Sequence, residues 1–526
     1  MEKMGRWWRE NWEVVAVLFL FIANFYLSLG LTPLFDLDEG AFSEATREML
    51  LNHNFITTYL NGHLRFDKPI LIYWLQALSV FLFGEHSWAF RLPSAIATTI
   101  WGGVIYWFTR RLYSPRAALY ALLVFSTALQ IGIIGKAAIA DALLNMWLAV
   151  TLLSLYLYIS TRRERWLLIA FAAAGFGFLT KGPVAVVVPI VPYFIYSLLN
   201  REIGHFFKSV FNWKGILLFT VIALPWYLAE YLQQGQKFID GFFLKHNLKR
   251  FETPLESHSG SIFYYLPVVV IGLLPWTTLL FSYLWNWKRW KGEKFGLFSL
   301  LVFGWVFLLF SLSGTKLPHY IIYGYTPLFV VMGKILEEYR SRLKLITPMA
   351  LFLGFLLILP FMARSLLPVI KDQFAKVAII TLLPYFDRFY FWAVLGLLIA
   401  LLYPFSLRTT RILLGLSGVV VVNYLLWIYA HFIQFPVYGA AQYVRHHQID
   451  KIVMWRLNTP SFILYSHRFV EKRDPKIGDI VLTRVTEIGK LPGYKPLYLK
   501  GGIALVKVTP PVSHSNPFNY RKDRRE

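Results

Sequence analysis

The sequence predicts an all-α membrane protein of about 13 transmembrane helices that carries a small α/β domain at its C-terminal end. Three observations support this fold class. Hydrophobic residues make up 57% of the 526 residues, charged residues make up only 16%, and the mean hydropathy is +0.51. Apolar segments long enough to span a bilayer follow one another along most of the chain. Roughly the last 90 residues, in contrast, have the mixed composition of a soluble domain.

The predicted spans are apolar segments of about 20 residues each. They begin near Glu13, Leu92, Arg116, Ala142, Trp166, Pro183, Lys214, Ser261, Phe295, Tyr320, Leu345, Phe389 and Ile412. Every second connecting loop, such as "TRRLYSPR" and "WNWKRWKGEK", is rich in Lys and Arg, as cytoplasmic loops are. We therefore expect a cytoplasmic N-terminus, in which "MEKMGRWWRENW" leads into an uncleaved first helix.

The segment "PILIYWLQALSVFLFG", residues 69–84, is apolar but short for a membrane crossing. Counting it as a span would invert the loop charges downstream. We expect a re-entrant or interfacial helix on the outer face. An odd number of spans then places the C-terminus outside as well.

The composition changes near Phe435, where we place a domain boundary between residues 1–434 and 435–526. "KIVMWRL", "DIVLTRV" and "IALVKV" are typical of strands, and "YGAAQYVRHH" is typical of a helix. A small periplasmic α/β domain with a basic tail is expected. The chain lacks Walker and GxGxxG motifs, which argues against nucleotide use.

Charge and cysteine content exclude further classes. The chain has no Cys, so thiolate zinc sites and a cysteine nucleophile are excluded. Lys and Arg exceed Asp and Glu by 53 − 29 = 24, but they are scattered among loops. Basic cytoplasmic loops explain most of this excess, and no nucleic-acid partner is expected. We expect a monomer.

The stretch "LFDLDEGAFSEATREML", residues 34–50, places five acids directly after the first span. Its apolar residues recur at helical spacing, so we expect a short amphipathic helix on the outer membrane surface. Asp36 and Glu39 fit a capping box. Capping does not need Asp38, which is therefore a candidate for chemistry.

Other ionisable residues fall in the remaining loops on the outer side. Each has a structural explanation when taken alone, such as an interfacial anchor or a surface ion pair. Together they predict a site where a carboxylate lies near a reacting group and cations surround a departing phosphate. Asp67 and His246 would also suit a divalent cation, Zn²⁺ or Mg²⁺/Mn²⁺, that bridges to the phosphate. The predicted set is Asp38, Asp67, Lys68, Asp141, Lys181, His246, Arg250, Lys316, His319 and Tyr320.

Six motifs occur in a fixed order: "DLDEGAFSEATREML", "FDKPILIYWLQAL", "AFRLPSAIA", "LTKGP", "KHNLKRF" and "GTKLPHYII". This ordered set resembles the GT-C membrane glycosyltransferases of the aminoarabinose-transferase and protein O-mannosyltransferase group. The resemblance covers residues 13 to about 435 and implies about 13 spans, outer juxtamembrane helices and an outer C-terminal domain.

The resemblance also implies roles for individual residues. Asp38 matches the family's catalytic aspartate, and Asp141, which matches a second outer acidic position in the cavity, is grouped with it as catalytic. Lys68 matches a lysine that binds the lipid phosphate. Arg250 and Tyr320 match further phosphate contacts of the family. Lys181, Lys316 and His319 are grouped with them. Asp67 stands where relatives often have Glu. In the family this position is implicated in metal or phosphate binding together with a histidine, and His246 matches that histidine.

The expected function is inverting transfer of 4-amino-4-deoxy-L-arabinose, or a related sugar, from undecaprenyl phosphate to lipid A. The reaction would take place at the periplasmic face of the bacterial inner membrane, without a nucleotide. Two alternatives stay open. One is transfer of mannose or galacturonic acid to protein or to the lipopolysaccharide core. The other is a lipid transporter or flippase, although the ionisable residues gather at one face and not at the bilayer midplane.

Overall fold

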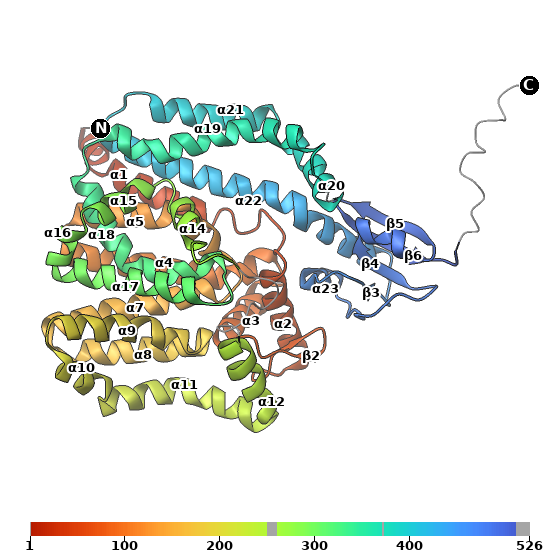
Figure 1. The fold of residues 1–526 in the computed structure, drawn as a ribbon, viewed down its shortest axis with the longest axis horizontal. Coiled ribbons are helices and arrows are strands. Elements are labelled where there is room, and N and C mark those ends of the chain that lie inside the picture. The colour runs from red at the N-terminus through yellow and green to blue at the C-terminus, as the bar shows by residue number, and fades with distance from the viewer. Residues whose placement is uncertain (1, 250–259, 371–372, 512–526) are drawn as a thin grey trace, which may run out of the picture. The chain divides into compact units, whose positions relative to one another are not determined.

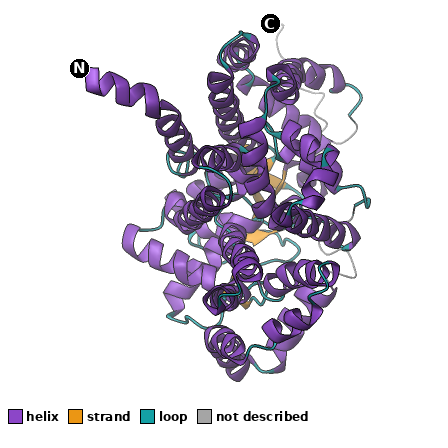
Figure 2. Cartoon of the chain, turned by 90° about the vertical axis from the view of Figure 1, so that its left-hand side faces the viewer, coloured by secondary structure: helices purple, strands orange, loops and turns teal. Residues whose placement is uncertain are grey.

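The computed structural model describes residues 2–249, 260–370 and 373–511. The chain divides into two compact units. Unit 1 contains residues 1–32, 45–359 and 387–427, and unit 2 contains residues 33–44, 360–386 and 428–526. Helices dominate the described residues, and the strands are few (Figures 1 and 2). The predicted mainly helical fold with a small strand region is confirmed.

The helices of residues 2–249 occur in the predicted order. They are α1 (Glu2–Phe25), α2 (Asp38–Asn52), α3 (Leu71–Phe83), α4 (Ser87–Leu112), α5 (Pro115–Thr127), α6 (Leu129–Ile134), α7 (Asp141–Thr161), α8 (Glu164–Lys181), α9 (Val184–Leu199), α10 (Ile203–Val210), α11 (Trp213–Gln234), α12 (Gln236–Phe238) and the π-helix η1 (Ile239–Lys249). A short hairpin of β1 (Tyr59–Leu60) and β2 (His63–Leu64) precedes α3.

The remaining helices complete both units. They are α14 (Tyr265–Gly272), α15 (Thr277–Trp285), α16 (Trp287–Gly292), α17 (Lys294–Leu312), the 3₁₀-helix η2 (Pro318–Gly324), α18 (Tyr325–Glu338), α19 (Arg342–Leu366), α20 (Gln373–Leu382), η3 (Leu383–Tyr385), α21 (Arg388–Leu402), α22 (Leu407–His446), α23 (Pro460–Ser466) and η4 (Val485–Lys490). Figure 1 shows α7, α8, α9 and α11 side by side in unit 1.

Each of the 13 predicted spans contains helix, but not every one is a single long apolar helix. By length and composition, five helices of the described residues could cross a membrane, or up to seven if each bent pair is one span. The segment predicted from Ser261 is such a pair, because α14 and α15 meet at 120°. The apolar segment at residues 69–84 forms α3, whose 13 residues make it a short helix. These apolar helices identify the chain as a multi-pass membrane protein. The number of crossings stays a prediction.

Local sequence signals explain how several helices begin. The Ser114 hydroxyl accepts a hydrogen bond from the Ala117 amide at the start of α5, and Pro115 occupies the first turn, where it removes no helical hydrogen bond. At the start of α11 the Asn212 side chain accepts from the Gly215 amide in the same way.

Unit 2 contains a four-stranded sheet in the order β3-β4-β6-β5. Its strands are β3 (Val453–Met454), β4 (Ile480–Arg484), β5 (Tyr494–Lys500) and β6 (Ile503–Val508). β3 pairs with β4 in parallel, and the other pairs are antiparallel. The three predicted strands are β3, β4 and β6, whereas β5 and α23 were not predicted. One face of the sheet packs on α22 and α23 around Phe462 and Leu482, which are fully buried.

The predicted helix at residues 438–447 is the last part of α22, whose 40 residues run without a break through Phe435. The compact units separate between residues 427 and 428, and unit 2 also takes in residues 33–44. The composition change thus falls inside one continuous helix, and the domain boundary between residues 434 and 435 stays a prediction.

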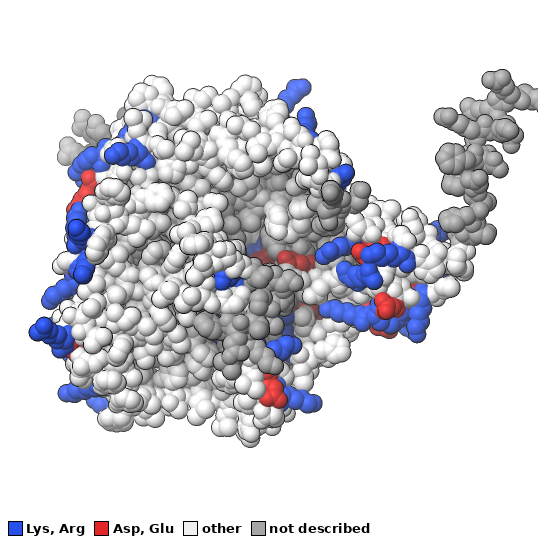
Figure 3. All heavy atoms as spheres, in the orientation of Figure 1, with Lys and Arg blue, Asp and Glu red and all other residues white. Residues whose placement is uncertain are grey.

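Charged residues lie mainly at the ends of the helices of unit 1. Figure 3 shows Lys and Arg along the edge where α10 and α16 lie and a wide surface of uncharged atoms beside it. This distribution is the one that a bilayer core imposes on helices crossing it.

Candidate functional site

The loop that leads into α2 is held by side chains of the C-terminal part of unit 2. Asp36 accepts hydrogen bonds from the Ser461 amide (2.8 Å), the Ser461 hydroxyl (2.5 Å) and the Gln434 side-chain amide (3.4 Å). The Asp36 amide in turn donates to Gln434 Oε1 at 3.0 Å. Burial raises the pKa of Asp36 to about 6, although the hydrogen bonds from Ser461 and Gln434 act in the opposite direction.

Asp38, two residues later, has different surroundings. It is the first residue of α2, and its side chain is exposed. Within the described ranges 2–249, 260–370 and 373–511, its carboxylate has neither a hydrogen bond nor an ion pair. A carboxylate without an internal partner is available to orient a substrate or to accept a proton.

The predicted capping box is wrong. Asp36 points to Ser461 instead of the first turn of α2, and Glu39 Oε2 accepts from the Phe35 amide at 2.8 Å. Because the partner of Asp36 lies 425 residues away, a local pattern could not reveal it. The long-range hydrogen bonds replace the local cap that the sequence suggested.

The expectation that α2 lies on the membrane surface with its polar side exposed is also wrong, because that side is buried. Glu39, Glu44, Arg47 and Glu48 are all 5% exposed or less. Glu48 accepts hydrogen bonds from the backbone amides of the hairpin turn, at Asn61 (2.5 Å) and Gly62 (3.0 Å). Since buried charged groups need such partners, these residues stabilise the fold around the β1–β2 hairpin.

The "FDKP" motif forms a compact group of charges before α3. Arg65 donates to Asp67 Oδ2 and Lys68 donates to Asp67 Oδ1, each at 2.9 Å. Each carboxylate oxygen of Asp67 thus already faces a cation. The group carries a net positive charge of 2 − 1 = 1, from two cations and one carboxylate.

Packing brings this group next to η1. A Cβ on Gly241 would lie 2.6 Å from the Phe66 ring, so the loop and the π-helix touch through this glycine. Gly182, which follows Lys181 and has a φ of +75°, approaches Phe242 of η1 in the same way. His246 lies on η1, but its side chain is outside the described part of the chain, and so is Arg250.

Asp141 is the centre of a second group. Its Oδ1 accepts from Lys181 Nζ (2.6 Å) and from the Tyr323 hydroxyl (2.7 Å), and His319 Nε2 lies at 3.6 Å. Lys181 also lies over the Tyr320 ring, 5.4 Å from its centroid. The structure therefore brings four of the predicted residues together, Asp141, Lys181, His319 and Tyr320. Asp141 is only 3% exposed.

Lys316 has a structural partner that the sequence did not suggest. Its ammonium donates to the carbonyls of Ser311 (3.0 Å) and Ser313 (2.7 Å), at the C-terminal end of α17. A cation is favourable at that end of a helix, where the last carbonyls lack intrahelical donors. The phosphate contact expected of Lys316 stays a prediction.

Several polar residues that join separate segments of the chain were not predicted. Gln76 donates to the carbonyls of Phe90 (3.1 Å) and Ala138 (3.1 Å), and Arg91 donates to those of Leu29 (2.8 Å) and Thr32 (2.8 Å). Both lie in apolar segments, and a polar residue in such a segment is the signal that could have identified them. Ser461 has no such signal.

Three comparisons with known proteins bear on this arrangement. The family described as "Dolichyl-phosphate-mannose-protein mannosyltransferase" matches residues 67–228. The chain is 32% identical over 339 residues to the protein of Edwardsiella ictaluri called "Undecaprenyl phosphate-alpha-4-amino-4-deoxy-L-arabinose arabinosyl transferase". That alignment covers 62% of this chain and 60% of the relative. The protein of the same name from Aeromonas hydrophila is 33% identical, over 61% of this chain and 60% of its own length. The chain thus spans about three fifths of these relatives.

The fold is that of a solved relative. ArnT from Cupriavidus metallidurans bound to undecaprenyl phosphate superposes with a TM-score of 0.78 at 20% identity, over 94% of this chain and 98% of that one. The apo form gives a TM-score of 0.75, with 20% identity, over 95% of this chain and 98% of that one. The resemblance seen in the sequence motifs is confirmed. The chain is thus similar in sequence to aminoarabinose transferases over about three fifths of their length, and its fold is that of ArnT.

Proposed function

We propose that the protein transfers 4-amino-4-deoxy-L-arabinose, or a related sugar, from an undecaprenyl phosphate donor to a lipid A phosphate. The observation that carries this proposal is the exposed carboxylate of Asp38, which has no partner among the described residues. The acids around it serve the fold, so Asp38 is the one carboxylate of its loop left for a substrate. The names of the relatives and the undecaprenyl phosphate bound to ArnT support the donor and the sugar.

The chemistry proposed is one displacement at the anomeric carbon. The bond from C1 to the donor phosphate oxygen breaks, and that oxygen leaves with the electron pair. A new bond forms between C1 and the acceptor oxygen on the opposite face, so the configuration inverts. Asp38 orients the acceptor and takes its proton when it carries one. A lipid A phosphate is already anionic, and Asp38 then needs only to orient it.

Cations stabilise the phosphate charge that develops as the donor leaves. Arg65 and Lys68 form a cationic group beside η1, which Phe66 contacts at Gly241, and Arg250 follows η1 in sequence. Asp141 is assigned a positioning role, because Lys181, His319 and Tyr323 already surround its carboxylate. In this proposal Asp141 holds Lys181 and His319 in place and does not touch the reacting atoms.

A divalent cation at Asp67 and His246 is a separate expectation. The described surroundings of Asp67 do not fit a metal ligand well, because Arg65 and Lys68 each lie 2.9 Å from one of its oxygens. A metal ion there would be repelled by two cations. Among the described residues no group of three or more His, Cys, Asp or Glu side chains could hold a metal ion. We therefore propose that Arg65, Asp67 and Lys68 balance the charge of the phosphate, and the proposed reaction contains no step at a metal ion.

The proposed location is the bacterial inner membrane, with a cytoplasmic N-terminus and the site at the periplasmic face. The alternation of basic loops supports this orientation. A donor carried on a lipid is needed at that face, because nucleotide sugars are confined to the cytoplasm.

The test measures lipid A in membranes of a lipid A-modifying host that expresses the wild type or Asp38→Asn at equal levels. The proposal expects a mass increase of one aminopentose with the wild type and none with the variant. Unmodified lipid A in both, with the donor shown to be present, would reject lipid A as the acceptor. The match to the mannosyltransferase family makes protein hydroxyls the next acceptor to assay.

A further inference from the structure

We propose that the C-terminal part of unit 2, from residue 428 onward and called the C-terminal domain below, positions the catalytic carboxylate: Ser461 and Gln434 hold Asp36, and Asp36 fixes the loop that presents Asp38. This inference rests on the proposed function, which assigns the chemistry to Asp38. The C-terminal domain would then contribute to the transfer step by positioning Asp38. The sequence of the domain itself suggests no such role.

The contacts between the loop and the domain are numerous for so short a segment. Besides the hydrogen bonds of Asp36, the Leu34 amide donates to the Tyr465 hydroxyl at 2.7 Å. The Phe35 ring stacks on Tyr429 with centroids 5.8 Å apart. Three consecutive residues, 34 to 36, are thus each bound by a side chain from α22 or α23.

Gly40 shows how closely the parts fit. A Cβ at this position would lie 2.5 Å from Asp36 Oδ1 and 2.6 Å from the Ser461 amide nitrogen. No other residue could bring the first turn of α2 so near to α23. Because Asp38 lies between Asp36 and Gly40, both sides of the catalytic residue are anchored while its own carboxylate stays exposed.

A displacement of about 1 Å at a catalytic group can lower a rate by about a hundredfold. We expect Asp36→Asn to lower kcat about tenfold while KM for the lipid donor stays within about twofold, because the loss is confined to the transition state. Ser461→Ala should act in the same direction, and Ser461→Thr, which keeps the hydroxyl, should restore much of the rate.

The experiment pairs sugar transfer with hydrogen exchange on the full-length protein. In Asp36→Asn, amide exchange should rise in residues 33–44 and at Ser461, whose amide donates to Asp36, and stay unchanged in residues 480–508. Arg456→Gln is the matched control, because it breaks an ion pair of the same domain with Glu487 (3.1 Å), away from the loop. It should leave both readouts unchanged.

Two further outcomes separate the proposals. In an Asp38→Asn background, Asp36→Asn should have no additional effect on transfer, since Asp36 acts only through Asp38. An additional loss, or unchanged exchange in residues 33–44, would overturn the positioning role. If the wild type transfers no sugar, the proposed function fails, and the exchange data still decide whether Asp36 anchors the loop.

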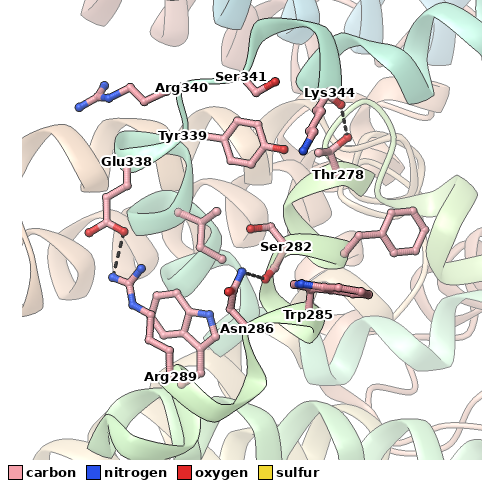
Figure 4. A pocket seen from close by; sticks show the side chains of 13 residues that line it. Thr278, Ser282, Trp285, Asn286, Arg289, Glu338, Tyr339, Arg340, Ser341 and Lys344 are labelled. Carbon is pink, nitrogen blue, oxygen red and sulfur yellow. Dashed lines mark hydrogen bonds and ion pairs between the residues drawn. The ribbon is translucent and has the colours of Figure 1, made fainter.

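A different observation carries a second inference. A cavity of about 730 Å³ lies at the far end of α17 and α18 from Lys316, lined by α15, α16, the end of α18 and the start of α19. We propose that it binds the phosphodiester headgroup of an anionic phospholipid. Figure 4 shows the Lys344 ammonium and the Tyr339 hydroxyl pointing into the same space.

The charges of the cavity favour an anion. Arg289, Arg340 and Lys344 line it with Glu338, which gives a net charge of 3 − 1 = +2. Arg289 is paired with Glu338 at 2.9 Å, whereas Arg340 and Lys344 have no carboxylate partner within the described ranges. Basic pockets between transmembrane helices are typical sites for anionic headgroups.

The rim fits a lipid better than a free ion. Trp285, which lines the cavity, is 88% exposed, and Leu343, which precedes Lys344 on α19, is 69% exposed. Exposed Trp residues are characteristic of the headgroup layer, and an apolar flank suits acyl chains. The cavity thus offers a polar end for a phosphodiester and an apolar wall for its chains.

Native mass spectrometry of the purified full-length protein tests this. Dioleoylphosphatidylglycerol should be retained at least about fivefold more than dioleoylphosphatidylcholine, and Arg340→Gln/Lys344→Gln should abolish the difference. Lys288→Gln/Lys291→Gln on α16 removes the same charge outside the cavity lining and should keep it. Trp285→Ala, at an exposed position, should also weaken retention.

Equal retention of both lipids, or an equal loss in the α16 control, would overturn the headgroup site. Inorganic phosphate at millimolar concentration should not displace the lipid. If it does so completely, the site takes a free phosphate and not a lipid.

Discussion

Asp38 and Asp141 lie in opposite surroundings, although both are acids at the start of a helix. Asp141 is buried, and Lys181, His319 and Tyr323 surround its carboxylate. Asp38 is exposed and has no partner among the described residues. A carboxylate whose charge is already neutralised by a buried cation gains little by meeting a substrate. The comparison therefore supports the proposal that Asp38 takes part in the chemistry and that Asp141 positions its neighbours.

The largest effect is expected at Asp38. Asp38→Asn should lower kcat by about a thousandfold, the scale of a lost acid–base or orienting group, while the thermal unfolding midpoint stays unchanged. Transfer is measured from the mass of extracted lipid A, and unfolding is measured in detergent. Activity close to that of the wild type would remove the difference between the two aspartates.

Asp141→Asn should act on stability instead. It leaves the Lys181 ammonium buried without an anionic partner, which typically costs about 3–5 kcal/mol. The unfolding midpoint in detergent should fall clearly, and Asp141→Asn/Lys181→Met should recover part of the loss because no unpaired charge remains. A stable Asp141→Asn protein with no transfer activity would instead make Asp141 catalytic.

Lys68 and Lys316 allow the comparison to be sharpened for the cations. Lys316→Met removes two hydrogen bonds to the end of α17, so we expect a loss of about 1–3 kcal/mol of stability and an unchanged KM for the donor. Lys68→Met should raise KM for the undecaprenyl phosphate donor severalfold. A rise in KM with Lys316→Met would support the phosphate role expected from the sequence.

The smallest effect concerns the pH dependence of the Asp36 anchor. Burial raises its pKa from 3.8 to about 6 in the folded protein, and the nearby Glu39 acts in the same direction. The folded state then binds a proton more tightly than the unfolded chain. Its contribution to stability is complete below about pH 4 and is lost as the pH rises through about 6. The unfolding midpoint in detergent should fall over this range, and Asp36→Asn should flatten the profile because the amide does not titrate.

Much of the fold was predictable because it depends on local patterns. Hydrophobic runs placed helices in all 13 predicted segments, and short strand-like runs placed β3, β4 and β6. β5 was missed because "YKPLYLK" is mostly exposed and lacks the buried pattern of its neighbours. Loop position predicted that Asp141, Lys181 and His319 lie at the same end of the helices, but not which of them pair.

The sequence by itself determined the membrane class, the order of the helices and the set of ionisable residues at one end of them. These follow from hydrophobicity and motif order, which are properties of short segments. Only the tertiary structure decided which acids are neutralised and which stay open. Asp36 meets Ser461 across 425 residues, and Asp141 meets Lys181 across 40, so neither pairing is present in any local pattern. Partner choice depends on packing between distant segments, and it is partner choice that separates the proposed catalytic aspartate from the others.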